Sequence, residues 1–128
     1  MMEEEKREAF TIPAEDGNGF ITISDDVVAD IAGLAVTEVD GVAHLTGTSP
    51  TEIITKIGKK KRSKGIRVIF EEEKCIRIDV SVIVRFGYNI VEVSAAVQER
   101  VKQALQTMTG LIPSVVNVRV SGVDFSKD

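Results

Sequence analysis

The segment from Cys75 to Phe125 predicts a strand, a helix and a second strand in direct succession. Its first part alternates apolar with mostly polar residues over eleven positions, and a period of two is the pattern of a strand with one apolar face. The apolar positions are Ile76, Ile78, Val80, Val82, Val84 and Phe86, and the intervening positions are Arg77, Asp79, Ser81, Ile83 and Arg85. A strand that buries one face only is typical of an antiparallel sheet.

The helix within this segment has signals at both ends. Asn89 can cap its first turn, with Glu92 at the third helical position, and Gly110 followed by Pro113 ends it. Apolar residues recur at helical spacing, namely Ile90, Val93, Val97, Val101, Ala104, Leu105 and Met108. The second strand alternates through Val116, Val118 and Val120. We expect the apolar stripe of the helix to pack on the apolar face of the first strand.

A second long helix is predicted between Ser24, which can cap it, and Gly41, and it follows a short strand at 20–23. Its apolar side consists of Val28, Ile31, Ala32, Ala35 and Val39. Gly33 lies in the helix interior, where glycine costs roughly 1 kcal/mol relative to alanine. We therefore expect a backbone to approach Gly33 closely, with the other long helix as the neighbour.

The remaining elements are short. A weaker strand is predicted at 42–46, and Ser49 with Glu52 forms a capping box that predicts a short third helix. Residues 65–71 alternate as a strand, and the turn that follows them leads into the strand after Cys75, so the two strands should form a hairpin.

These elements predict an α+β fold: about four strands in a mainly antiparallel sheet, two long helices packed on one face, and one short extra helix. Residues 1–16 carry a run of charged side chains and turn-forming residues, so we expect a disordered acidic tail there. The rest of the chain, residues 17–126, should form a single domain.

Four motifs occur in order along the chain: IS-x-x-V, EVDGV, MTG and VNV-x-V-x-GV. They lie within GFITISDDVVADIAGLAVTEVDGVAHLTG, KGIRVIFEEEKCIRIDVSVIVRFG and the segment that follows. In this order the sequence resembles the alkaline shock protein family of small bacterial stress and cell-envelope proteins, over roughly residues 17 to 125. The resemblance implies a non-enzymatic, self-associating protein, and some members are held at the inner face of the membrane by a separate membrane-anchored partner. It brings no catalytic residues.

Composition favours a soluble, cytoplasmic protein. The chain of 128 residues is 43% hydrophobic and 28% charged, which is the ordinary globular range. Cys75 is the one cysteine, so it permits no internal disulfide and is consistent with a reducing compartment. No apolar run approaches the ~18 residues of a membrane helix, so we expect any contact with the inner face of the membrane to be peripheral.

A basic segment interrupts this acidic chain between Lys56 and Lys64, where six of the sixteen basic residues lie. The candidate anion-binding residues are Lys59, Lys60, Lys61, Arg62 and Lys64. One interpretation is weak peripheral contact with anionic lipid, to which each basic side chain contributes about 1 kcal/mol. RNA is the alternative ligand, disfavoured because no aromatic residue lies among the lysines to stack on bases. The third interpretation is a solvated loop without a ligand.

The inventory of reactive side chains argues against an enzyme. His44 is the one histidine and lies in a predicted strand, which favours a structural role over that of a general base. Cys75 begins an apolar strand with no candidate base near it in sequence. We therefore predict no catalytic residues, and the sequence contains neither the spaced His and Cys pairs of a zinc site nor a complete glycine-rich cofactor motif.

The polar face of the predicted sheet is the candidate protein interface. Two isoleucines should lie there among charged side chains, and a mixed surface of this kind suits self-association or partner docking. The candidate residues are Arg67, Ile69, Arg77, Asp79, Ile83 and Arg85. The sequence thus predicts a cell-envelope stress protein that forms homo-oligomers and binds a membrane-anchored partner or the anionic membrane surface. A small anion-binding module with RNA as its ligand is the alternative.

Overall fold

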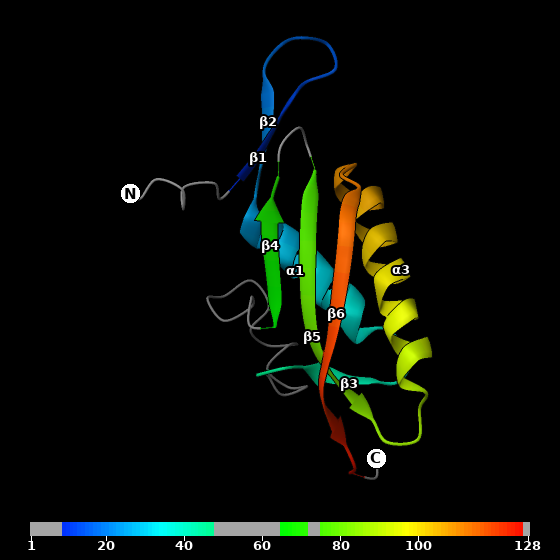
Figure 1. Cartoon of the computed structure of the whole chain (residues 1–128). Coiled ribbons are helices and arrows are strands. Elements are labelled where there is room, and N and C mark those ends of the chain that lie inside the picture. The colour runs from blue at the N-terminus through cyan, green and yellow to red at the C-terminus, as the bar shows by residue number, and fades with distance from the viewer. Residues whose placement is uncertain (1–8, 48–64, 72–74, 127–128) are drawn as a thin grey trace.

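Strand β5 (Ile76–Arg85) is the centre of a four-stranded sheet. One of its edges pairs antiparallel with two short strands in succession, β4 (Ile66–Phe70) and β3 (Val42–Leu45). Its other edge pairs with β6 (Pro113–Asp124), which runs parallel to it (Figure 1). The computed structural model describes residues 9–47, 65–71 and 75–126. The α+β class and the hairpin of β4 with β5 are confirmed, and the sheet is mixed because β6 is parallel.

Two helices lie on the same side of this sheet (Figure 1). Helix α1 (Asp25–Thr37) begins after Ser24, whose side chain accepts a hydrogen bond from the Asp26 amide. Helix α3 (Ile90–Thr109) begins after Asn89, whose Oδ1 accepts from the Glu92 amide at 2.9 Å, and it ends at Gly110. These caps confirm the predicted helix starts, because each satisfies an amide that has no partner within its helix. The short helix predicted near Ser49 lies outside the described residues.

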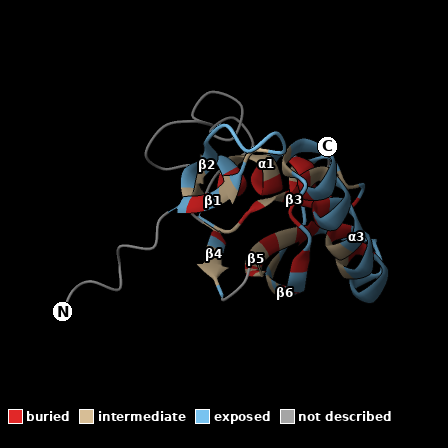
Figure 2. Ribbon diagram, turned by 90° about the horizontal axis from the view of Figure 1, so that it is seen from above, coloured by how far each residue is buried: buried red, intermediate tan, exposed pale blue. Residues whose placement is uncertain are grey.

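The core lies between the helices and the sheet. Alternate residues of β5 are completely or almost completely buried, while those between them are half-buried or exposed, which confirms the period of two (Figure 2). The buried residues of β5 are Ile76, Ile78, Val80, Val82 and Val84, and those of α3 are Val93, Val97, Val101 and Leu105. The predicted apolar sets extend too far at their ends, since Phe86, Ile90 and Met108 are all exposed. Phe86 follows the last residue of β5, and Ile90 and Met108 lie in the first and last turns of α3, so none of them packs against the opposite layer.

The predicted disordered tail is wrong for residues 9–13. They form strand β1 (Ala9–Pro13), which pairs antiparallel with β2 (Phe20–Ser24) in a separate two-stranded sheet. Phe10 is buried, and its ring centroid lies 5.0 Å from that of Phe70 in β4. This aromatic contact connects the hairpin to the main sheet, and its burial explains why the segment is ordered.

The neighbours of Gly33 also differ from our expectation. A Cβ atom placed on Gly33 would lie 3.6 Å from the Leu45 side chain and 3.9 Å from that of Ile66. The neighbours of Gly33 are therefore side chains of β3 and β4, not the other long helix. A Cβ atom would make ordinary van der Waals contacts with them, so the expected close approach of a backbone is not found.

Candidate functional site

The candidate site is the face of the four-stranded sheet turned away from α1 and α3, which we call the outer face. Strand register determines which residues meet there, because directly paired residues point to the same side. Arg67 is opposite Asp79, and Asp79 is opposite Asn117 on the other side of β5. Two residues further along β5, Ser81 is opposite Arg119. The outer face thus brings together side chains from β4, β5 and β6.

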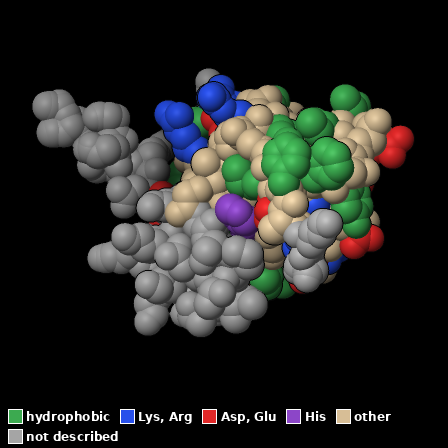
Figure 3. Space-filling view, turned by 90° about the horizontal axis from the view of Figure 1, so that it is seen from below, with side chains coloured by type: hydrophobic (Ala, Val, Ile, Leu, Met, Phe, Trp, Pro, Cys, Tyr) green, Lys and Arg blue, Asp and Glu red, His purple; other side chains and the backbone are tan. Residues whose placement is uncertain are grey.

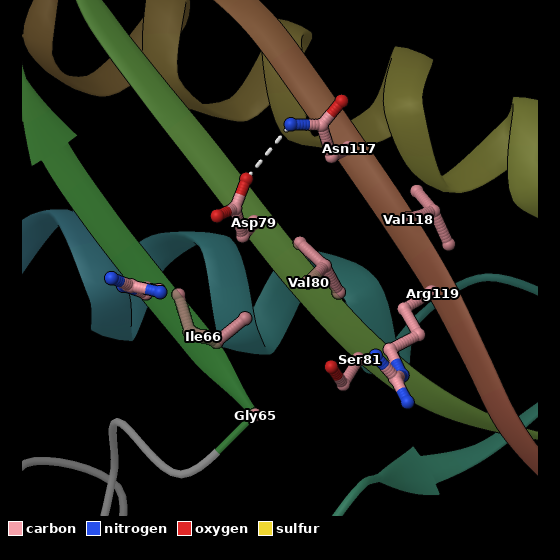
Figure 4. A pocket seen from close by; sticks show the side chains of 9 residues that line it. Gly65, Ile66, Asp79, Val80, Ser81, Asn117, Val118 and Arg119 are labelled. Atoms are coloured by element: carbon pink, nitrogen blue, oxygen red, sulfur yellow. Dashed lines mark hydrogen bonds between the residues drawn. The ribbon is translucent and has the colours of Figure 1, made fainter.

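Asp79 is the centre of a small polar network on this face. Its Oδ1 accepts a hydrogen bond of 2.9 Å from Nδ2 of Asn117 (Figure 4). The same oxygen lies 3.6 Å from Nε of Arg77. Arg77 also reaches Glu71, with 4.0 Å between Nη1 and Oε2. The carboxylate of Asp79 therefore has a positive and a neutral partner, and both are on the outer face.

An open hollow of about 540 Å³ lies beside this network. Its lining consists of Gly65, Ile66, Arg67, Asp79, Val80, Ser81, Asn117, Val118 and Arg119. The hollow coincides with the junction between β3 and β4: Ser81 accepts at its carbonyl from the Thr46 amide and donates its own amide to the Gly65 carbonyl. The small residues at this junction, Gly65 and Ser81, leave space that the larger neighbours surround (Figure 4).

Two arginines of the hollow differ from Arg77. Arg67 and Arg119 are exposed, and neither has an ion pair within the part of the chain that the structure describes. Figure 4 shows Arg119 beside Ser81 on the outer face. Arg67 was among the interface residues predicted from the sequence and Arg119 was not, since the sequence does not show that the register of β6 places Arg119 opposite Ser81.

The two isoleucines of the predicted interface are half-buried. Ile83 is paired with His44 on one side and with Gly122 on the other. A Cβ atom on Gly122 would lie 3.1 Å from Cδ1 of Ile83, so the Ile83 side chain lies over this glycine. Ile69 is opposite Arg77. Arg85, the sixth candidate, is exposed at the end of β5.

An exposed aromatic pair was not predicted as part of any site. The rings of Phe86 and Phe125 lie 5.1 Å apart between centroids, and each residue is 68% exposed. The Phe86 amide donates to the Asp124 carbonyl, which keeps the ends of β5 and β6 together. Hydrophobic side chains gather at this end of the molecule, as Figure 3 shows. The sequence indicated the exposure of Phe86 through Gly87, because a glycine at this position ends the strand and leaves Phe86 outside the core.

The one histidine and the one cysteine are both half-buried. His44 is half-buried, with 3.0 Å between its Nδ1 and the carbonyl oxygen of Leu45. Cys75 is half-buried at the start of β5. The amide and hydroxyl of Ser126 both donate to Oδ1 of Asp124 and lower the pKa of that carboxyl group. Within the described ranges, no three His, Cys, Asp or Glu side chains are grouped as metal ligands would be.

The basic candidates Lys59, Lys60, Lys61, Arg62 and Lys64 lie outside the described residues. In sequence they precede Gly65, which lines the hollow. Among the described residues, neither helix is both long and apolar enough to cross a bilayer.

Residues 14–125 match the alkaline shock protein 23 family, which is described as having a cell envelope-related function. The chain is 38% identical to the uncharacterized protein YqhY of Bacillus subtilis over 107 residues, covering 84% of this chain and 78% of that protein. It is 36% identical over 107 residues to the uncharacterized protein YloU of Bacillus subtilis, covering 82% and 88%. It is 33% identical over 115 residues to the uncharacterized protein Spy1614 of Streptococcus pyogenes, covering 88% and 94%. No solved structure matches the chain.

Proposed function

Because the chain belongs to the alkaline shock protein 23 family, with its cell envelope-related function, we propose that it is a non-catalytic envelope stress protein that acts by binding other proteins. Its partners in this proposal are further copies of the same chain and a membrane-anchored protein. The contact surface is the outer face, centred on Ile69 and Ile83 with Arg67, Arg77, Asp79 and Arg85 around them.

The observation that carries the proposal is the difference between the two faces of the sheet. The inner face is covered by α1 and α3, whereas no described helix covers the outer face (Figure 2). The outer face combines charged side chains with half-buried isoleucines, and protein interfaces typically surround a small apolar centre with a polar rim. Exposed charges such as that of Arg67 would give such a contact its specificity.

The Ile83→Glu variant tests this interface. We expect it to lower the oligomer mass measured by light scattering, because it places a charge at the apolar centre of the contact. Ile83 is half-buried against Gly122, so a loss of about 1 kcal/mol in folding stability is expected while the circular dichroism spectrum stays unchanged.

Val91→Glu is the matched control for this experiment. Val91 is 75% exposed on α3, on the opposite layer, and receives the same new charge. Its oligomer mass should equal that of the parent protein. If the Ile83→Glu protein stays assembled while folded, the interface lies elsewhere.

The basic segment is expected to give weak binding to anionic vesicles and none to neutral ones. Raising the salt concentration through physiological strength should abolish this binding, because screening weakens contacts between exposed charges. Co-sedimentation of the protein with vesicles measures the effect. Replacing Lys59, Lys60, Lys61 and Arg62 together with serine should remove it. Unchanged binding by this variant would leave the segment as a solvated loop, and tight RNA binding by the same four residues would favour the RNA alternative.

A further inference from the structure

Among the described residues, the hollow on the outer face has two positive groups on opposite sides and one negative group, which already has partners. Arg67 comes from β4 and Arg119 from β6, with β5 between them. The negative charge within the hollow is that of Asp79, and Arg77 and Asn117 already interact with it. An arginine without a carboxylate partner is available to bind an oxyanion through its planar fork of donors.

Strand geometry allows both guanidinium groups to reach one small ligand. Arg67 is opposite Asp79 and Arg119 is opposite Ser81, two residues further along β5. With strands about 4.8 Å apart and a rise of about 3.3 Å per residue, the two Cα atoms are separated by roughly 12 Å. Both side chains are long enough for their charged ends to contact one ligand in the hollow, and Figure 4 shows the Arg119 side chain beside Ser81.

The other polar groups of the hollow suit hydroxyl groups. Ser81 can donate and accept a hydrogen bond, and the second oxygen of Asp79 is an acceptor. The volume of about 540 Å³ lies within the range of about 300–1,000 Å³ that is usual for small-molecule sites. A ligand that satisfies this lining carries an oxyanion for the arginines and hydroxyls for Asp79 and Ser81.

We propose that the hollow between Arg67 and Arg119 is a binding site for the phosphate ester of a small polyol. The phosphate bridges the two guanidinium groups, and the polyol hydroxyls bind Asp79 and Ser81. This chemistry occurs in free polyol phosphates and in lipid headgroups that contain one. The site goes beyond the proposed function, since it requires neither self-association nor a protein partner.

Isothermal titration calorimetry of the full chain with glycerol phosphate tests the free ligand, and co-sedimentation with phosphatidylglycerol vesicles tests the headgroup. Arg67→Ala and Arg119→Ala should each weaken binding roughly tenfold or more, because each removes charge-assisted hydrogen bonds to the phosphate. Both residues are exposed and have no ion pair among the described residues, so both variants should keep the parent melting temperature. Glycerol, which lacks the oxyanion, should not bind.

Lys102→Ala is the charge-matched control, since Lys102 is exposed on α3 in the opposite layer. Saturable binding of glycerol phosphate that both arginine variants weaken and Lys102→Ala does not supports the site with a free ligand. The same pattern with phosphatidylglycerol vesicles alone, and not with phosphatidylcholine, supports it with a lipid headgroup; this arm is measured above physiological salt, where binding through the basic segment is expected to be lost. The proposal is overturned if neither glycerol phosphate nor phosphatidylglycerol binds. It is also overturned if binding survives both arginine substitutions, or if Lys102→Ala weakens binding equally. Light scattering on the same variants separates loss of ligand from loss of assembly.

Discussion

A Val101→Asp variant is expected to be largely unfolded under conditions where the parent protein is folded. Val101 is completely buried on α3, in the core cluster that joins the helices to the sheet. No buried side chain within the described residues is polar or charged, so the new carboxylate would find neither an ion pair nor a hydrogen-bond donor there. An unpartnered buried charge costs more than about 4 kcal/mol, a large part of the 5–15 kcal/mol by which domains are ordinarily stable.

Gln103→Asp controls for the helix itself. Gln103 is exposed on α3, so this variant changes helix propensity and adds a charge without entering the core. Its melting temperature should stay within a few degrees of the parent, whereas Val101→Asp should lose the cooperative transition in circular dichroism and near-native dispersion in proton NMR spectra. Equal melting temperatures for the two variants would contradict the position of α3 in the fold.

The parts of the fold that could be predicted are those with local signals. Asn89 and Gly110 bound α3 because caps act through adjacent backbone groups, and the stripe from Val93 to Leu105 identifies the buried side of the same helix. The period of two in β5 is equally local. Such signals need no knowledge of which other segment packs against them.

Pairing was harder to predict, because it depends on segments far apart in sequence. Strand β1 follows a charged run and is only five residues long, so its local signal was weak; the contact of Phe10 with Phe70 explains its order. The hollow was also not predicted, because it too is formed by segments far apart in sequence. Gly65 precedes β4, Ser81 lies in β5 and Arg119 lies in β6, and the register of β5 with β6 brings the last two together.

The second large effect concerns Gly41, and we expect Gly41→Ala to destabilise the protein far more than Gly87→Ala. Both glycines have positive φ angles, 97° and 101°, which cost a residue with a Cβ atom about 1–3 kcal/mol. A Cβ atom on Gly87 would have no neighbour within 4 Å. On Gly41 it would lie 2.7 Å from Cγ2 of Val93 and 2.8 Å from Cδ2 of Tyr88, so atoms must move.

The Val93 side chain cannot move aside easily. It is buried, and a β-branched residue in a helix has one strongly preferred rotamer. Overpacking therefore adds a further cost of about 1–3 kcal/mol to the backbone strain at Gly41. Gly41 also accepts the Arg85 amide at 2.7 Å, so a shift of its backbone would disturb the pairing at the end of β5. Urea denaturation of both variants measures the difference directly: a lower midpoint for Gly41→Ala than for Gly87→Ala is expected. Equal midpoints would show that the contact of Gly41 with α3 is not tight, because backbone strain alone is common to both substitutions.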